Sequence, residues 1–318
     1  MKSVITYSPA FTIVPTYECF NRCSYCNFRV DVGTEESTSI EQTEKKLQKL
    51  DKQLIAEILV LSGEVHPLSI NRAKWFTKIH KTCQLALDYD FLPHTNAGPL
   101  SWAEMKQLKE LNVSMGLMLE QVNPKFLQTV HQNAPSKQPQ LRLQQLEWAG
   151  KFKIPFTTGI LLGIGETMQD IEESLQAIAS IQNRWAHIQE VILQPHSVGS
   201  KQEADLPTFE PSLLPTVIAK AKKILPESIS IQIPPNLVAD SNFLLDCLEA
   251  GATDLGGLSP VDEVNPDYPH PTAESLSRIL AQAGWRLKPR LPVYSKYYSW
   301  LPIALQKAVR KKEMGLNL

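Results

Sequence analysis

The stretch Glu18-Cys-Phe-Asn-Arg-Cys-Ser-Tyr-Cys-Asn-Phe28 places three of the chain's five cysteines within eight residues, in a C-x3-C-x2-C array. Structural zinc sites normally have four protein ligands, and the nearest histidine, His66, lies forty residues beyond the array. Three thiolates can instead hold three irons of a four-iron cluster and leave the fourth iron open to a small molecule. The array therefore predicts a [4Fe-4S] cluster on Cys19, Cys23 and Cys26, with a zinc knuckle or a chance group of buried thiols as the alternative.

Outward from this loop, strand-like segments alternate with helix-like segments along the chain, the pattern of a parallel α/β fold. The first strand would deliver the cysteine loop at its carboxyl end. Eight strand-helix units predict a TIM-type (β/α)8 barrel, with a partial six-stranded barrel as the alternative, and chemistry is expected at the carboxyl ends of the strands. The predicted strands are residues 11–16, 55–61, 91–94, 114–119, 156–162, 190–194, 229–233 and 253–258.

No internal repeat or domain linker interrupts this alternation, so residues 1–318 are expected to form a single domain. The barrel would span about residues 9–285. Residues 286–318 are basic and aromatic, and we expect them to pack on the barrel, with a lid over the site as the alternative.

Composition excludes several classes of partner. The 32 basic and 33 acidic residues nearly cancel, and no long run of like charge appears, so neither a nucleic-acid surface nor an acidic tail is indicated. The first residues lack a signal-peptide core, and no apolar run approaches the length of a membrane span. We therefore expect a cytoplasmic protein, in a reducing compartment that suits free thiolates.

With Tyr25 directly before its last cysteine, the array resembles the signature of the radical S-adenosylmethionine (SAM) superfamily. The resemblance implies that SAM chelates the open iron through its amino and carboxylate groups. One electron from the reduced cluster then splits SAM and gives a 5'-deoxyadenosyl radical.

Other segments resemble cofactor-binding elements of this superfamily. Ser62-Gly63-Glu64 stands where a Gly-Gly-Glu turn usually meets the SAM amino group, with Ser62 as a departure; an ordinary turn is the alternative. Glu120 resembles an acid that holds the ribose hydroxyls, and Arg142 an arginine that grips the cofactor carboxylate.

Residues 159–166 resemble a G-x-I-x-G-x-x-E element that backs the adenine. Leu161 stands where isoleucine is usual, and Glu166 has a helix-capping role as its alternative. Polar residues at other strand ends are candidates for substrate contact, with a structural role as the alternative. They are His94, Thr95, Asn96, Gln194, His196 and Asp254.

A narrower resemblance covers most of the chain. Six segments together are similar to the 7,8-didemethyl-8-hydroxy-5-deazariboflavin synthase family, the first subunit of FO synthase, although residues 194–201 depart from its usual pattern. These segments are residues 7–19, 26–29, 62–66, 93–99, 114–120 and 251–260.

This resemblance implies a specific reaction. The substrate would be an adduct of tyrosine's hydroxybenzyl group with ribityl-aminouracil, supplied by a companion radical SAM enzyme. Hydrogen abstraction, ring closure and loss of ammonia would give the deazaflavin FO, with 5'-deoxyadenosine and methionine as by-products. A flavodoxin- or ferredoxin-type protein would donate the electron.

Three alternatives stay open. The companion enzyme itself would share the cofactor, but residues 26–29 and 251–260 favour the cyclising family. A biotin-synthase-like sulfur inserter needs further ligating cysteines, whereas Cys83 and Cys247 fall on predicted helices as core residues. The third alternative is a metal-binding protein without catalysis.

Overall fold

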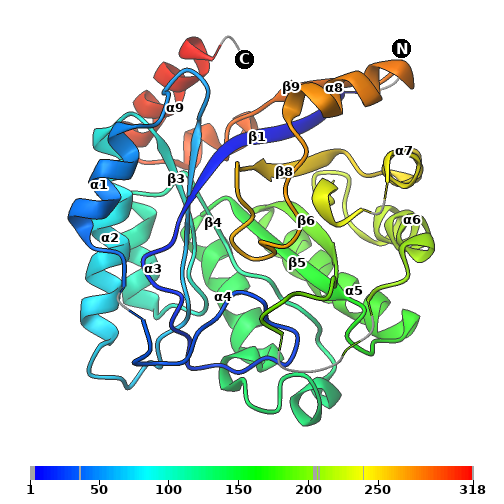
Figure 1. Cartoon of the computed structure of the whole chain (residues 1–318), viewed down its shortest axis with the longest axis horizontal. Coiled ribbons are helices and arrows are strands. Elements are labelled where there is room, and N and C mark those ends of the chain that lie inside the picture. Colours follow the sequence, from blue (N-terminus) through cyan, green and yellow to red (C-terminus); the bar gives the residue numbers. More distant parts are fainter. Residues whose placement is uncertain (1–3, 36, 203–205, 207, 239, 317–318) are drawn as a thin grey trace.

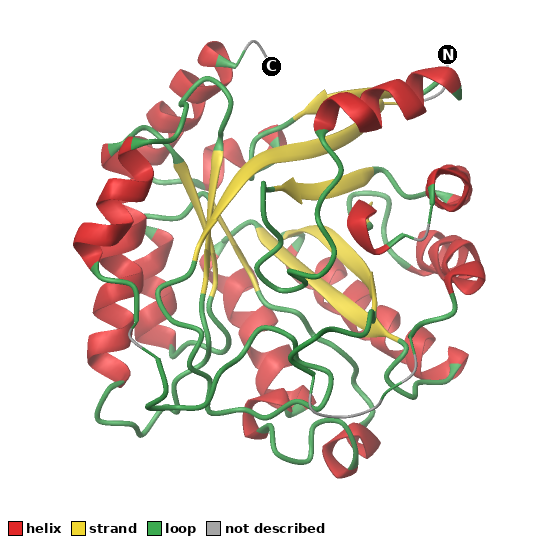
Figure 2. Cartoon of the chain, in the orientation of Figure 1, coloured by secondary structure: helices red, strands yellow, loops and turns green. Residues whose placement is uncertain are grey.

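Eight parallel strands form a closed barrel in the computed structural model, which describes residues 4–35, 37–202, 206, 208–238 and 240–316 (Figures 1 and 2). The eight-stranded prediction is confirmed. The barrel strands are β1 Val4–Ile13, β2 Glu57–Leu61, β3 Leu92–Asn96, β4 Ser114–Gly116, β5 Phe156–Leu162, β6 Ile188–Pro195, β7 Ser230–Gln232 and β8 Asp254–Leu258.

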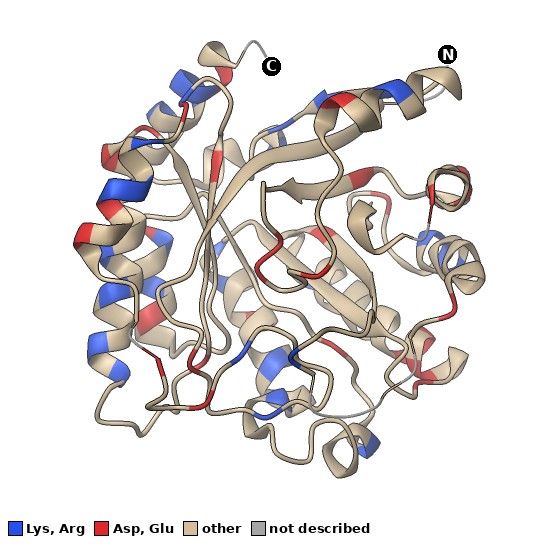
Figure 3. Ribbon diagram, in the orientation of Figure 1, with Lys and Arg blue, Asp and Glu red and all other residues tan. Residues whose placement is uncertain are grey.

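Helices surround the barrel and cover the outer face of the strands (Figure 2). None of those described is long and apolar enough to cross a lipid bilayer. Figure 3 shows acidic and basic residues interspersed over the outer helices. The α-helices are α1 Ile40–Gln48, α2 Arg72–Asp88, α3 Trp102–Lys109, α4 Pro139–Phe152, α5 Met168–Trp185, α6 Leu214–Ile224, α7 Ser241–Ala250, α8 Ala273–Gln282 and α9 Ile303–Gly315. Short 3-10 turns lie at η1 Pro124–Gln128, η2 Pro135–Lys137, η3 Pro211–Leu213, η4 Pro235–Leu237 and η5 Ser295–Trp300.

Strand β1 starts seven residues before the predicted position because it has three partners. One edge pairs with β8, and Ala10–Ile13 on the other edge pairs with β2, which closes the barrel. The amino-terminal part of β1, Val4–Tyr7, pairs in parallel with a ninth strand, β9 (Arg286–Pro289), which the sequence pattern did not reveal. The sheet therefore extends one strand beyond the barrel at its amino-terminal end.

The residues after β9 pack against the amino-terminal ends of the barrel strands, which lie opposite the cysteine loop (Figure 1). This cluster joins Leu291, Val293, Tyr297, Leu301, Leu305 and Val309 to Ala56, Leu92 and Val113. Because Ala56, Leu92 and Val113 lie at the starts of β2, β3 and β4, the segment closes the base of the barrel and does not form a lid over the cysteines.

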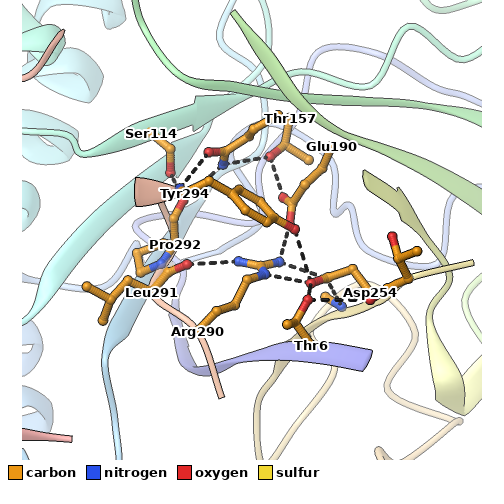
Figure 4. A network of polar contacts seen from close by, with 12 residues as sticks. Thr6, Ser114, Thr157, Glu190, Asp254, Arg290, Leu291, Pro292 and Tyr294 are labelled. Carbon is orange, nitrogen blue, oxygen red and sulfur yellow. Dashed lines mark hydrogen bonds and ion pairs between the residues drawn. The ribbon is translucent and has the colours of Figure 1, made fainter. Parts of the chain in front are cut away.

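Arg290, directly after β9, is the centre of a buried ionic network inside the base of the barrel (Figure 4). Its Nε and Nη2 lie 2.6 and 2.7 Å from the two carboxylate oxygens of Asp254, and Nη2 also pairs with Glu190. The Tyr294 hydroxyl lies 3.2 Å from one carboxylate oxygen of each acid, so its single proton is shared between them. Burial raises the pKa of Glu190 to about 7, although Arg290 favours its ionised form.

Asp254 was expected to face a substrate, but it is fully buried in this network. It is the first residue of β8 and therefore lies at the base of the barrel rather than at the carboxyl end of the strand. The prediction was wrong because the strand begins at this residue.

Replacing Arg290 by Met should lower the free energy of unfolding by about 3–5 kcal/mol, because it leaves two buried acids without their cation. Urea denaturation measures the change. Arg278→Met is the matched control: the exposed Arg278 pairs with Glu274 at 3.8 Å on α8, and its loss should cost less than about 0.5 kcal/mol. Equal effects of the two substitutions would contradict a stabilising role for the network.

Candidate active site

The cysteine loop, residues 17–30, is fixed to its neighbours by backbone hydrogen bonds. The amide of Phe20 donates to the carbonyl of Glu64 at 3.0 Å, just beyond the end of β2. The amide of Ser24 donates to the carbonyl of Val130 at 3.0 Å, in the connection after β4. The loop is therefore attached to two different barrel units, which sets its position over the carboxyl ends of the strands.

The three cysteines line one cavity of about 350 Å³ that extends into the barrel as far as Arg290 and Pro292. Apart from Thr95, Glu166 and Asp254, the site residues predicted from the sequence also line this cavity, so the fold gathers strand ends that are distant along the chain. These residues are Tyr25, Ser62, Gly63, Glu64, His94, Asn96, Glu120, Arg142, Leu161, Gln194 and His196.

All three thiols are free. Burial raises the pKa of Cys19 to about 11 and that of Cys23 to about 12. Metal binding at these thiols would therefore release protons, as it does wherever a thiolate ligand is required. Among the described residues, no three Cys, His, Asp or Glu side chains converge closely enough to hold a single metal ion. The donor set fits a cluster, in which each thiolate binds a different iron.

Gly63 lets the end of β2 approach the cysteine loop. A Cβ at this position would lie 2.1 Å from the carbonyl oxygen of Glu18, so a larger residue would push the loop away. Ser62, the departure from the usual glycine, has a structural partner: its hydroxyl accepts a 2.9 Å hydrogen bond from Trp75 Nε1 on α2. The serine is thus accommodated by the packing of α2.

Glu64 connects the cysteine loop to Arg142. Its amide donates to Cys19 Sγ at 3.3 Å, and its Oε1 accepts from Arg142 Nη2 at 3.0 Å. Asn21 Nδ2 lies 2.9 Å from Oε2, and the Ser136 hydroxyl donates to the same oxygen. Arg142 is only 1% exposed. Sequence reasoning missed Asn21 and Ser136, because a polar residue in a loop carries no periodic signal.

Glu120 has a left-handed backbone, with φ +67°, which turns the chain at the end of the β4 segment. Its buried carboxylate pairs with Lys137 of η2, a cation that the sequence did not indicate. Next to this pair, the Tyr25 hydroxyl lies 3.0 Å from His131 Nε2. Burial lowers the pKa of His131 to about 3, so this imidazole is neutral near pH 7.

Leu161 and Glu166 have different surroundings. Leu161 packs with Phe126 and Ile164 and gives the cavity an apolar wall. The Glu166 carboxylate accepts hydrogen bonds from the amides of Gly163 and Ile164 at 2.6 and 2.8 Å. Glu166 therefore stabilises the turn before α5. The helix-capping alternative for Glu166 was wrong, because Thr167 is the N-cap of α5.

Three of the substrate-contact candidates come from β3. His94 Nδ1 lies 2.7 Å from the Ser114 hydroxyl, and burial lowers the pKa of His94 to about 3. Asn96 is half-buried at the carboxyl end of the strand. The prediction for Thr95 was wrong: it is fully buried, its hydroxyl donates to Asn112 Oδ1 at 2.7 Å, and it does not line the cavity. A neutral imidazole can donate or accept one hydrogen bond toward the cavity.

The remaining two substrate-contact candidates, Gln194 and His196, lie in residues 194–201, the segment that departs from the usual pattern of the synthase family. Gln194 is in β6, and His196 Nε2 lies 2.8 Å from the Gln202 side-chain oxygen. The same segment reaches the cysteine loop, because the amide of Lys201 donates to Asn27 Oδ1 at 2.8 Å. The departure thus falls where the wall of the cavity meets the cysteine loop.

Two buried acids that sequence reasoning missed, Glu57 and Glu190, also line the cavity near its base. They belong to β2 and β6 rather than to the turns that follow these strands. The available signal was a charged residue within an otherwise apolar strand, where an inward-facing acid is costly unless it has a function.

Comparisons with known proteins agree with this geometry. The family model described as the radical SAM superfamily matches residues 13–178. A 7,8-didemethyl-8-hydroxy-5-deazariboflavin synthase from Trichormus variabilis is 62% identical over 308 residues, which cover 97% of this chain and 91% of the relative. The synthase of the same name from Trichodesmium erythraeum is 57% identical over the full length of both proteins.

The chain belongs to the 7,8-didemethyl-8-hydroxy-5-deazariboflavin synthase family of the radical SAM superfamily.

Solved structures show that the fold of this synthase family member is shared more widely. The FeFe-hydrogenase maturase HydG from Carboxydothermus hydrogenoformans superposes with a TM-score of 0.74 at 16% identity, over 98% of this chain and 77% of the maturase. Methylornithine synthase (PylB) superposes with a TM-score of 0.70 at 15% identity, over 94% of this chain and 86% of that protein. Membership of the radical SAM superfamily implies a [4Fe-4S] cluster and SAM as cofactors.

Gly98→Ala should weaken SAM binding by on the order of tenfold or more, because a Cβ there would lie 2.3 Å from Glu64 Cγ and displace that side chain. Gly284→Ala is the matched control. Both glycines have positive φ, +76° and +84°, and both substitutions should cost about 1 kcal/mol of stability, but residue 284 faces open space. Anaerobic SAM titration, with thermal unfolding alongside, separates the two effects. Unchanged SAM affinity in Gly98→Ala would contradict a role for Glu64 in binding SAM.

Proposed function

We propose that this chain is a 7,8-didemethyl-8-hydroxy-5-deazariboflavin synthase that converts the hydroxybenzyl adduct of ribityl-aminouracil to the deazaflavin FO. The observation that carries the proposal is the match, at 57% identity over the whole chain, to a synthase of that name. The single cavity that joins the cysteine loop to a polar base supports it, since cofactor and substrate must meet in one closed space.

Cys19, Cys23 and Cys26 are the proposed ligands of three irons of a [4Fe-4S] cluster. When bound, the cluster and SAM supply the one-electron chemistry that gives the 5'-deoxyadenosyl radical. The role of the chain is to hold these groups and to exclude water from them. The residues of the cysteine loop and the end of β2 perform this role through the close contact at Gly63.

The SAM contacts are proposed from the walls of the cavity. Ser62, Gly63 and Glu64 would meet the amino group, and Arg142 the carboxylate, so that the Glu64–Arg142 pair matches the two charges of the methionyl end. Glu120 would accept the ribose hydroxyls. Tyr25 and Leu161 border the same space and are proposed to contact the nucleoside.

His94, Asn96, Gln194 and His196 are proposed substrate contacts. The conversion removes one ammonia, one hydrogen atom that ends in 5'-deoxyadenosine, one proton, and one electron that returns to the iron-sulfur cluster. Because a radical would react with any nearby hydrogen donor, holding the adduct still is as important as supplying polar groups.

The proposed partners follow from the same reaction. A companion radical SAM enzyme would supply the adduct, and a flavodoxin- or ferredoxin-type protein would reduce the cluster. A reducing cytoplasm would suit the five free cysteines.

The proposal is tested by anaerobic reconstitution with iron and sulfide, followed by reductant, SAM, tyrosine, ribityl-aminouracil and a known companion enzyme. Deazaflavin fluorescence should appear only when both enzymes and every other component are present. Fluorescence from this chain without the companion would assign it the joining reaction as well. SAM cleavage without the chromophore would leave a radical SAM enzyme with a different substrate, and neither activity would indicate a metal-binding protein without catalysis.

Replacing any one of Cys19, Cys23 and Cys26 by Ala should abolish SAM cleavage, because the cluster loses a ligand while the barrel keeps its core. Circular dichroism checks the fold, and iron content and chromatographic detection of 5'-deoxyadenosine measure the loss. Cys247→Ala is the control: this thiol is fully buried on α7, away from the cavity, and its replacement should leave iron content and cleavage intact. Retained cleavage in any of the three loop variants would refute the ligand assignment.

A further inference from the structure

Glu57 lies at the base of the cavity, far from the cysteines. It is the first residue of β2 and lies five positions before Ser62, a distance of roughly 16 Å along a strand. Its side chain lines the cavity although the residue is only 7% exposed. A buried acid in this position can contact only the part of a substrate that extends away from SAM.

The neighbouring acid, Glu190, already has three partners. Its Oε1 receives Arg290 and the Tyr294 hydroxyl, and its Oε2 accepts from Thr157 at 2.8 Å (Figure 4). Glu57, by contrast, forms no ion pair with any residue that the structure describes, since Arg290 is engaged by Glu190 and Asp254. Of the two acids, Glu57 is the one available to a ligand.

Burial also favours the neutral form of Glu57. Desolvation raises the pKa of this carboxyl group, although a hydrogen bond with Ser8 and the nearby Arg290 guanidinium favour the ionised form. A neutral carboxyl group presents one O–H donor and one carbonyl acceptor side by side, whereas an ionised one only accepts.

We propose that Glu57, buried at the base of the cavity, recognises the uracil ring of the substrate by pairing with its N3–H and an adjacent C=O. This inference rests on the proposed function and assigns a specificity-determining residue to the same cavity.

The match is one of chemical complementarity. A uracil ring carries its N3–H between two carbonyl groups. The N3–H and either neighbouring C=O together offer one donor and one acceptor, at a spacing that matches the C=O and O–H of a carboxylic acid. The phenol of the adduct offers a single O–H, and the ribityl chain offers flexible hydroxyls without this fixed pair. The uracil ring is therefore the part of the adduct that best uses a neutral buried acid.

The test compares Glu57→Gln with Glu57→Met, and the probe is ribityl-aminouracil, titrated calorimetrically into the cluster-loaded enzyme with SAM under anaerobic conditions. Glutamine keeps one donor and one acceptor, so its Kd should stay within about threefold of that of the wild type. Methionine has a similar volume but cannot make either bond, and its Kd should rise by ~10- to 100-fold. Loss of affinity in Glu57→Gln equal to that in Glu57→Met would overturn the proposal.

A second probe tests the same contact without a mutation. Ribityl-aminouracil methylated at N3 lacks the donor, so the wild type should bind it ~10- to 100-fold more weakly than the parent compound. Glu57→Met should bind both probes about equally. Equal binding of the two probes by the wild type would overturn the proposal even if a Glu57 variant failed to fold.

The affinity should also depend on pH. Wild-type binding should weaken as the pH rises through the pKa of Glu57, because the ionised form loses the donor, whereas the Gln variant should not show this step. The other titratable and charged groups facing this position are His94 from β3, Glu190 from β6, Asp254 from β8 and Arg290 after β9, and they are unchanged in the variant. The same pH dependence in both proteins would assign the step to one of those groups and contradict the proposal.

Failure of the proposed function has a different signature. If the wild type forms FO in the reconstituted assay but binds both probes equally, only the role of Glu57 is wrong. If the wild type neither binds ribityl-aminouracil nor forms FO, the proposed function itself fails.

Discussion

The close contact between the end of β2 and the cysteine loop is the constraint on which the rest of the site depends. Gly63 allows the two backbones to approach, and the amide and carbonyl of Glu64 then bond to Cys19 Sγ and to the amide of Phe20. A side chain at residue 63 would separate the loop from the strand. The position of the loop thus follows from backbone geometry, and the orientation of Glu64 toward Arg142 follows from the position of the loop.

A network of buried charges determines the structure at the opposite end of the barrel. Burying Arg290, Glu190 and Asp254 together is costly in free energy, and such groups persist only where they satisfy one another. The network requires Arg290 from beyond β9, so the carboxyl-terminal segment completes the interior of the barrel as well as covering its base. The segment therefore belongs to the cavity, although it lies at the end of the chain.

The sequence predicted the features that short-range spacing encodes. The spacing of the three cysteines and the apolar pattern of each strand or helix are each contained in a short stretch of chain, and the eight-stranded fold is as expected. The ninth strand and the ionic network were not predicted, because Glu190 and Arg290 are a hundred residues apart and only closure of the barrel brings them together. Lys137, which pairs with Glu120, was missed for a different reason: a single lysine outside any periodic pattern looks like a solvated residue.

The two ends of the cavity are therefore built by different physical rules. The cysteine end relies on local backbone contacts that any chain with the same loop and strand-end spacing can reproduce, and a common cofactor requires no more than that. The base relies on isolated polar residues within strands, such as Glu57 and Glu190, whose pKa values burial raises and Arg290 lowers. Such positions can change one at a time without disturbing the cysteine loop. Selection between substrates that share a cofactor is thus expected to reside at the base, where the surroundings of a single acid decide whether it donates or only accepts a hydrogen bond.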